Sequence, residues 1–528
     1  MRPYEYFGTV TDPNPTVAVT GGAIRGRTKD GVAIFAGIPY GGDVSGEHRF
    51  LPPTPVEPWE GTLDCTKPGK AAIQGLQGPG GNPILDYVTG GRAEEIGIFD
   101  ETSGENCLVL NVLTPGLDGK KRPVLFYIHG GGYANGSGLL ALGGDKWCRE
   151  EDIVLVSVNH RLNVFGYLYL GGFDPKYADS GCAGLLDLVQ ALEWVRQNIA
   201  AFGGDPENVA IFGESGGGSK VSHLCAMEQS KGLFRKAIVM SGSAMPGELS
   251  VDPHDIPLEE AHATACDLLK ALGVSPEDIS PLLTQPARRI YDAAIELRAD
   301  RVKGGNFCPV IDNRTVFPNP VPGQFTALPN TRNIPMIIGS TQDETAMYSR
   351  PDCYHLTWET LPEKVMDRCD LDRETADRVI AVYRQAEPEN TAPVTYFRIA
   401  SDCGFTRYAV SQIEARMKPG IAKTWRYQFT WDVPACTPVG PIMASHTTDL
   451  PLEFRLAYYP ESEELSRSLA HAWAQFARTG DPSDAWLKWP AYEPEHKYCM
   501  IFDLEPHLAS DPDGMVRPLF DTIASYLM

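Results

Sequence analysis

The stretch Asn208–Lys220, NVAIFGESGGGSK, constrains the fold of this chain more than any other part of it. An apolar run typical of a buried strand leads at once into a glycine-rich turn and then into the start of a helix. The turn carries the pattern G-x-S-x-G, with Ser215 at its centre. Such a turn needs small neighbours, lifts the serine hydroxyl clear of the sheet and aims backbone N–H groups at whatever the serine attacks. The stretch predicts a nucleophilic serine; because the pattern is short, an ordinary glycine-rich turn is the alternative.

A second glycine-rich run, HGGGY at 129–133, directly follows the apolar segment 124–128. Glycines at the end of a buried strand let backbone amides approach a ligand closely, as an oxyanion hole requires. H-G-G-G is also the pattern of esterase and lipase oxyanion loops. We therefore expect amide donors here rather than a flexible loop, and we expect His129 to support the loop rather than to act as a base.

The order of apolar segments predicts the fold class. Strand-like runs lie at 108–112, 124–128, 153–159, 209–212, 237–240, 336–339 and 424–430. Residues 184–198 have helical spacing. Alternation of buried strands with helices predicts an α/β fold with a large, mostly parallel central sheet flanked by helices. Helical, irregular stretches around 247–329 and 345–420 are expected to be insertions into a single domain that spans residues 1–528.

Composition excludes several classes of function. The chain has 528 residues, 43% of them hydrophobic, and a formal net charge of −22. This acidity argues against nucleic acids and anionic membranes as partners. No apolar run is long enough to span a bilayer, and the 12 cysteines show no zinc-ligand spacing. The first residues lack the apolar core of a signal peptide, so we expect a cytoplasmic protein, with secretion after removal of a signal as the alternative.

Short motifs in a fixed order give the chain a resemblance to one known family. They lie at 38–40 (IPY), 105–108 (ENCL), 129–133 (HGGGY), 158–162 (VNHRL), 184–187 (GLLD), 203–206 (GGDP), 212–217 (FGESGG), 241–243 (SGS), 339–344 (GSTQDE), 446–449 (HTTD) and 476–482 (FARTGDP). With these motifs the chain resembles the type-B carboxylesterase/lipase family, the α/β-hydrolases that include the cholinesterases. So many ordered motifs are far more specific than G-x-S-x-G alone.

The resemblance implies a role for each candidate residue. Ser215 corresponds to the nucleophile, His446 to the general base and Glu344 to the acid that orients it, in the chain order of α/β-hydrolases. The oxyanion hole corresponds to the backbone amides of Gly131, Gly132 and Gly216. Ser241 and Asp449 match positions that lie behind the histidine and help to hold it. Asp343 is expected to hold the loop that carries Glu344. Glu214 is expected to point away from Ser215 into a buried hydrogen-bond network.

The chain departs from the family pattern at several positions. Gly216 stands where alanine is frequent, which keeps the amide, and Thr345 follows Glu344 where glycine is common. The resemblance also implies a disulfide between Cys65 and Cys107, which a reducing cytoplasm would leave open. The tryptophan that choline-specific members carry between these cysteines is absent, so a choline esterase is not expected.

The sequence thus predicts a serine hydrolase that cleaves carboxylic esters through an acyl-enzyme, without a metal or organic cofactor. The loop between Cys65 and Cys107 is rich in glycine, with few apolar residues for a lid (Ile84, Leu85, Tyr87, Val88, Ile96, Ile98 and Phe99), so short-to-medium acyl chains are favoured. Three alternatives stay open: a lipase for longer chains, an amidase, and a non-catalytic interaction protein on the same fold. The physiological ester and the oligomeric state are left open.

Overall fold

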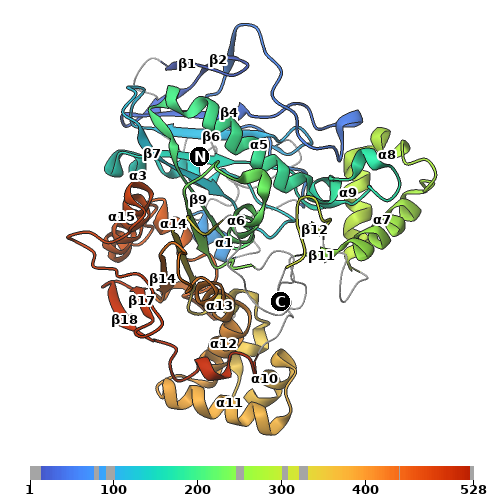
Figure 1. Ribbon diagram of the computed structural model, residues 1–528. Helices are drawn as coiled ribbons and strands as arrows, with labels where there is room; N and C mark the ends of the chain where they lie inside the picture. The colour runs from blue at the N-terminus through green and yellow to red at the C-terminus, as the bar shows by residue number, and fades with distance from the viewer. Residues whose placement is uncertain are drawn as a thin grey trace.

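The computed structural model describes residues 14–75, 83–90, 102–244, 255–299, 307–319, 331–438 and 440–523. Its centre is an 11-stranded sheet in the order β18-β17-β14-β13-β10-β9-β7-β8-β6-β4-β3 (Figure 1). In chain order these strands are β3 (Arg27–Lys29), β4 (Val32–Pro39), β6 (Val109–Thr114), β7 (Arg122–Ile128), β8 (Val154–Val158), β9 (Gly204–Glu214), β10 (Lys236–Met240), β13 (Met336–Thr341), β14 (Thr424–Phe429), β17 (Tyr498–Phe502) and β18 (His507–Ser510).

The middle of this sheet is parallel. Every neighbouring pair from β17 across to β8 runs parallel, and the pairs at the two edges are antiparallel. In a parallel sheet all carboxyl ends lie at one edge, where α/β proteins place their ligands. The predicted α/β class with a large, mostly parallel central sheet is confirmed.

Helices cover both faces of the sheet. Successive residues of β7 alternate between two buried clusters: Phe126 and Ile128 pack with α5 (Ala183–Asn198) and α6 (Gly216–Ala226), while Leu125 and Tyr127 pack with α3 (Asp145–Glu151) and α15 (Glu463–Thr479). A strand that is buried on both faces reads as a continuous apolar run, as this one does.

The remaining elements lie around this three-layered centre. Short strands form separate small sheets: β1 (Thr16–Val19), β2 (Gly22–Arg25) and β5 (Thr62–Asp64), then β11 (Ile256–Pro257) with β12 (Val310–Ile311), and β15 (Val433–Cys436) with β16 (Pro441–Met443). Helices α1 (Pro83–Val88), α4 (Asn163–Tyr167) and α14 (Leu450–Glu453) are one or two turns long.

Two further groups of helices lie beyond the layers that cover the sheet in Figure 1, although one helix of the second group (Arg407–Ala415) packs on β13 and β14. One comprises α7 (Leu258–Leu272), α8 (Pro281–Thr284) and α9 (Ala287–Ala299), and the other α10 (Leu361–Cys369), α11 (Arg373–Ala386), α12 (Ala392–Ser401) and α13 (Arg407–Ala415). A π-helical turn, η11 (Asp402–Thr406), joins α12 to α13. Both groups fall within the stretches expected as insertions. That the chain forms one domain stays a prediction.

Cys65 and Cys107 are two buried free thiols, so the disulfide implied by the resemblance is not formed. Both lie near β4, but at different points. The carbonyl of Cys65 accepts from Ala36 N at 2.7 Å, whereas that of Leu108 accepts from Tyr40 N at 3.1 Å. Four residues of strand span roughly 13 Å, and a disulfide needs Cα atoms within about 7 Å.

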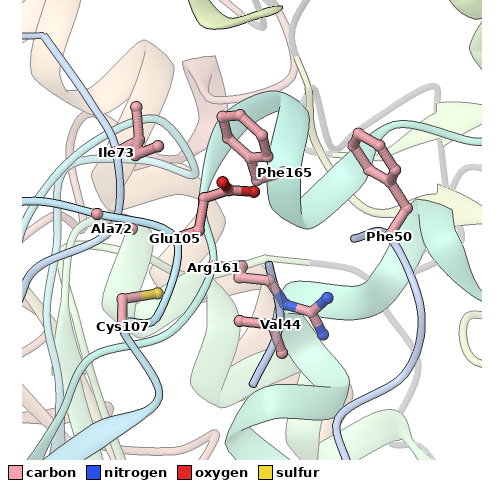
Figure 2. A pocket seen from close by; sticks show the side chains of 9 residues that line it. Val44, Phe50, Ala72, Ile73, Glu105, Cys107, Arg161 and Phe165 are labelled. Atoms are coloured by element: carbon pink, nitrogen blue, oxygen red, sulfur yellow. The ribbon is translucent and has the colours of Figure 1, made fainter. Parts of the chain in front are cut away.

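Cys107 instead shares a small cavity with Ala72 (Figure 2). The charged groups of Glu105 and Arg161 also line it, together with the rings of Phe50 and Phe165. None of the residues expected to be catalytic lines this cavity. It is a packing feature and not the site that the glycine-rich motifs predict.

Candidate active site

Ser215 stands at the sharp turn between β9 and α6, with φ 57° and ψ −129°. A positive φ at a residue with a side chain is strained, and such strain gathers at functional sites. The glycines on either side are required. A Cβ at Gly213 would lie 2.5 Å from the carbonyl carbon of Gly217, and a Cβ at Gly217 would lie 2.1 Å from the carbonyl oxygen of Ile128. The local sequence therefore forces Ser215 to the apex, as the motif predicts.

His446 and Glu344 come from loops that follow other strands. Nδ1 of His446 lies 2.5 Å from Oε2 of Glu344, and both side chains are buried. The other carboxylate oxygen, Oε1, accepts from the backbone N–H of Thr341 at 2.8 Å. Glu344 is thus held at both oxygens, and it can fix the ring orientation and tautomer of His446.

Nε2 of His446 faces Glu214, whose Oε1 lies 3.3 Å away. Neither atom has a hydrogen-bond partner within the described ranges. The expectation that Glu214 joins a hydrogen-bond network away from the site is therefore wrong. Strand residues two apart share a face, so Glu214 lies on the face of Phe212, which packs on Phe454 a few residues beyond the His446 loop.

The charges of this pair influence each other. Burial raises the pKa of Glu214, and His446 opposes that rise. Burial lowers the pKa of His446, but the carboxylates of Glu214 and Glu344 outweigh this and raise it overall. The imidazole is thus prepared to carry a positive charge, which a general base must do in the transition state.

Residues 129–133, which we call the glycine loop, pack directly against the turn at Ser215, which we call the elbow. A Cβ at Gly130 would lie 3.2 Å from Cβ of Ser215, and a Cβ at Gly216 would lie 2.4 Å from Cα of Gly132. Gly131 and Gly132 have φ of 86° and 61°, a region that favours glycine. The departure from alanine at position 216 therefore has a steric reason, because the backbone of Gly132 occupies the space of a methyl group.

The peptide planes of this loop are fixed from their carbonyl sides. The carbonyl of Gly130 lies 2.9 Å from Nδ1 of His129, and that of Gly131 accepts from the amides of Ala134 and Asn135, each at 3.2 Å. In a trans peptide the N–H points opposite to the carbonyl. The amides of Gly131 and Gly132 therefore point away from these contacts, and in the described part of the chain they have no backbone acceptor.

His129 supports this loop as expected. Its ring is buried and stacks on His160, with centroids 4.6 Å apart. Burial, and after it the charge of Lys220, lowers the pKa of His129 to about 3, and the contact with the Gly130 carbonyl opposes this. A neutral, enclosed imidazole that binds the loop backbone fits a structural residue rather than a second base.

Two aromatic rings flank His446 that the sequence did not single out. The centroids of Tyr348 and Phe405 lie 5.4 and 5.0 Å from that of His446. Tyr348 is 58% exposed, yet the surrounding protein raises its pKa, with Glu214 and Glu344 adding to the rise and the Ser215 side chain opposing it. Tyr348 lies four residues after Glu344, so its closeness in the sequence could have pointed to it. Phe405 lies in the π-helical turn η11, far from every site motif in the sequence, so no sequence signal pointed to it.

The other predicted residues take defined places. Asp343 is buried in an ion pair with Arg398 and fixes its loop through its amide, which donates to Ala444 O at 2.9 Å. Asp449 Oδ2 accepts from Tyr427 Oη at 3.2 Å. Ser241 is buried with φ 47°. Within the described part of the chain, neither Ser241 nor Asp449 forms a hydrogen bond with His446, so their supporting role stays a prediction.

Part of the segment between Cys65 and Cys107 borders the site. Tyr87 of α1 donates to the carbonyl of Thr448 at 3.1 Å, two residues after His446. Residues 76–82 and 91–101, with Ile96, Ile98 and Phe99, lie outside the described residues. Within the described ranges, no helix has the length and apolar composition that a membrane crossing requires.

Comparisons with known proteins show similarity over nearly the whole chain. The family model described as "Carboxylesterase family" matches residues 13–515. A para-nitrobenzyl esterase of Bacillus subtilis is 34% identical over 94% of this chain and 96% of its own length. A phenmedipham hydrolase of Pseudarthrobacter oxydans is 31% identical over 92% and 94%. The crystal structure of a Geobacillus stearothermophilus carboxylesterase superposes with a TM-score of 0.77 at 33% identity, covering 96% of this chain and 99% of that one.

Proposed function

The chain belongs to the carboxylesterase family and is a carboxylic ester hydrolase, and we propose that it acts on short-to-medium acyl esters through Ser215, His446 and Glu344. The observation that carries this proposal is the placement of His446. One ring nitrogen is held by Glu344 at 2.5 Å, and the other has no hydrogen-bond partner in the described residues. A neutral imidazole held in this way accepts a proton at Nε2.

The mechanism proceeds through an acyl-enzyme. His446 removes the proton of Ser215 as its oxygen attacks the ester carbonyl, and Glu344 stabilises the imidazolium that forms. The tetrahedral oxyanion is bound by the amides of Gly131, Gly132 and Gly216, donors worth roughly 3 kcal/mol each in comparable sites. The alcohol leaves with the proton from His446, and water then repeats the sequence on the acyl group.

Esters with an aromatic group are proposed as good substrates. The rings of Phe405 and Tyr348 both pack against His446, and aromatic groups pack well against such rings. Two relatives, by their names, act on a para-nitrobenzyl ester and on phenmedipham. The substrate is a small molecule, and the cytoplasmic location, with secretion as the alternative, stays part of this proposal.

The test is hydrolysis of p-nitrophenyl esters from acetate to palmitate, with para-nitrobenzyl acetate added. Wild type is compared with Ser215→Ala and with Ser222→Ala, which changes another serine of α6. We expect activity on short chains, its loss in Ser215→Ala and its retention in Ser222→Ala. A preference for palmitate would support the lipase instead. If the wild type is inactive on every ester, the non-catalytic interaction protein becomes the better explanation. If it cleaves a matched anilide faster than the ester, the protein is an amidase.

A further inference from the structure

A lysine in the middle of the elbow helix is buried against the glycine loop. Lys220 of α6 is fully buried, with no exposed side-chain surface. Its Nζ donates to the carbonyl of Gly132 at 2.5 Å and lies 3.4 Å from the carbonyl of His129. It also lies 4.9 Å from the ring centroid of Tyr133, a cation–π distance. A lysine is almost never fully buried unless its amine is satisfied, and here the loop backbone supplies the partners.

The contact with Gly132 completes the set of clamps on the loop. The carbonyls of Gly130 and Gly131 are already engaged by His129 and by the amides of Ala134 and Asn135. Lys220 engages the next carbonyl, so three successive peptide planes are each fixed from the carbonyl side. The plane before Gly132 carries its amide, and the plane after it carries the carbonyl that Lys220 binds. Because the two planes meet at the Cα atom of Gly132, fixing the second plane holds that atom, and the amide attached to it, in place.

The missing methyl group at position 216 fits the same arrangement. A Cβ at Gly216 would lie 2.4 Å from the carbonyl oxygen of Gly132, the atom that Lys220 binds. Glycine at 216 makes room for this carbonyl, and Lys220, four residues later on the same helix, holds it there. The two residues therefore act on one atom.

Tyr133 closes the loop and is fixed from the same helix. Its hydroxyl lies 2.8 Å from Oγ of Ser219 and 3.2 Å from Nδ1 of His223, whose Nε2 lies 2.6 Å from Asp255. The loop end is thus rigid, and Lys220 acts on its centre. Burial lowers the pKa of Lys220 to about 7, against the charges of Cys308 and Glu214. Charged or neutral, the amine keeps at least two N–H donors for the two carbonyls.

From this geometry we infer that Lys220 is a positioning residue, which sets the oxyanion hole by holding the carbonyl of Gly132 against the elbow helix. The inference rests on the proposed function, because the amides it positions are the proposed oxyanion donors. Lys220 does not touch the substrate. Its loss should weaken transition-state binding and leave ground-state binding nearly unchanged.

The test compares Lys220→Met with a matched control, Lys236→Met. Lys236 is also buried, and burial lowers its pKa to about 8. It donates to Asn208 Oδ1 and begins β10, whereas Met240 at the other end of that strand accepts from the amide of Ser215. Both changes remove a buried amine and keep the chain length, but only the first touches the glycine loop.

We expect Lys220→Met to lower kcat for p-nitrophenyl acetate about 30- to 100-fold, less than the roughly 100- to 1000-fold cost of removing an oxyanion donor itself, with KM within about threefold. A trifluoromethyl ketone that mimics the tetrahedral adduct should bind weaker by a similar factor. Lys236→Met should keep kcat within about threefold, even where its melting temperature falls equally. A normal kcat in Lys220→Met, or equal losses in both variants, would refute the inference.

A double variant tests whether Lys220 and Gly216 act on the same atom. In a Gly216→Ala background the methyl group has already displaced the Gly132 carbonyl. Adding Lys220→Met should therefore lower kcat by less than about a further threefold. If the double variant lost kcat by the product of the two single losses, the two residues would act independently, which would contradict the inference. If Lys220→Met does not fold, Lys220→Gln replaces it in the same cycle, and full multiplication would count against the inference there too. Inactive wild type, or active Ser215→Ala, would instead refute the proposed function itself.

Discussion

Oε1 of Glu214 lies 3.3 Å from Nε2 of His446, the ring nitrogen that takes the proton of Ser215 in the proposed mechanism. The residue directly before the nucleophile thus supplies a carboxylate to the base from the side opposite Glu344. Two carboxylates around one imidazole stabilise its protonated form. This has a direct consequence for the pH at which the enzyme works.

Glu214→Gln should move the acid limb of the kcat/KM profile to lower pH. His446 must be neutral to act as a base, so activity rises as the pH passes upward through its pKa. Glu214 is the foremost of the groups that raise this pKa against burial. Removing its charge lowers the pKa, and we expect a shift of about 1 to 2 pH units. The profile is measured with p-nitrophenyl acetate between pH 5 and 10; a limb that moves to higher pH would contradict the assignment.

Glu344→Gln and Asp343→Asn should separate catalysis from loop stability. Glu344→Gln keeps the shape but loses the charge beside Nδ1 of His446, and kcat should fall about 10⁴-fold as in other triads. Asp343→Asn breaks a buried ion pair with Arg398. Arg398 retains its second ion pair, in which its Nε lies 3.1 Å from Glu387. It should lower the free energy of unfolding by about 2 kcal/mol. Steady-state kinetics and urea unfolding are measured on both; the reverse pattern would exchange the two roles.

Phe405→Ala should weaken selection for aromatic esters. The Phe405 ring packs on His446 with centroids 5.0 Å apart, and a second ring in the substrate can extend this contact. We expect kcat/KM for para-nitrobenzyl acetate to fall about 2- to 10-fold more than that for ethyl acetate, the worth of one aromatic pair. Trp486→Ala, which removes an exposed ring that packs edge-on against His471, is the control. Equal losses on both esters would show that Phe405 only supports His446.

Asp449→Asn should stabilise the protein at alkaline pH. Burial, followed by the charge of Glu344, raises the pKa of Asp449 to about 7, whereas a free aspartate has a value near 3.8. The folded state therefore binds a proton that the unfolded state has lost, and the associated stability is fully present below about pH 4 and is lost as the pH rises through 7. Asparagine mimics the protonated form throughout.

The measurement for this variant is the difference in melting temperature between Asp449→Asn and wild type. It should grow in favour of the variant between pH 5 and pH 8.5. A difference that stays constant over this range would mean that Asp449 does not hold a proton in the folded state.

The fold class and the main site residues could be predicted from the sequence because their signals are local. An apolar run before Gly213-Glu214-Ser215-Gly216-Gly217 predicts a strand, an elbow and a helix, and the steric contacts of Gly213 and Gly217 explain why no larger residue fits. The H-G-G-G loop and the position of Glu344 and His446 after later strands follow in the same way. A parallel sheet then brings the strand ends together at one edge.

Contacts between segments far apart in the chain could not be predicted from the sequence, and only the tertiary structure shows them. Glu214 was expected to face away from the site, but the face of β9 on which it lies also receives the loop of His446. The resemblance implied a possible disulfide between Cys65 and Cys107, but both are free thiols, and Cys107 lines a small cavity together with Ala72 instead. Phe405 reaches His446 through a π-helical turn that leaves no sequence pattern.

Short-range patterns therefore determined which residues can do chemistry, because a strained turn or a close backbone approach restricts the residue types that fit. They could not determine the partner of each group. Lys220 reads in the sequence as one more polar residue of a helix, and only packing against the glycine loop assigns its amine to the carbonyl of Gly132. The reason is physical: burial and charge interactions depend on distances through space, and these are set by how the whole sheet and its covering helices pack.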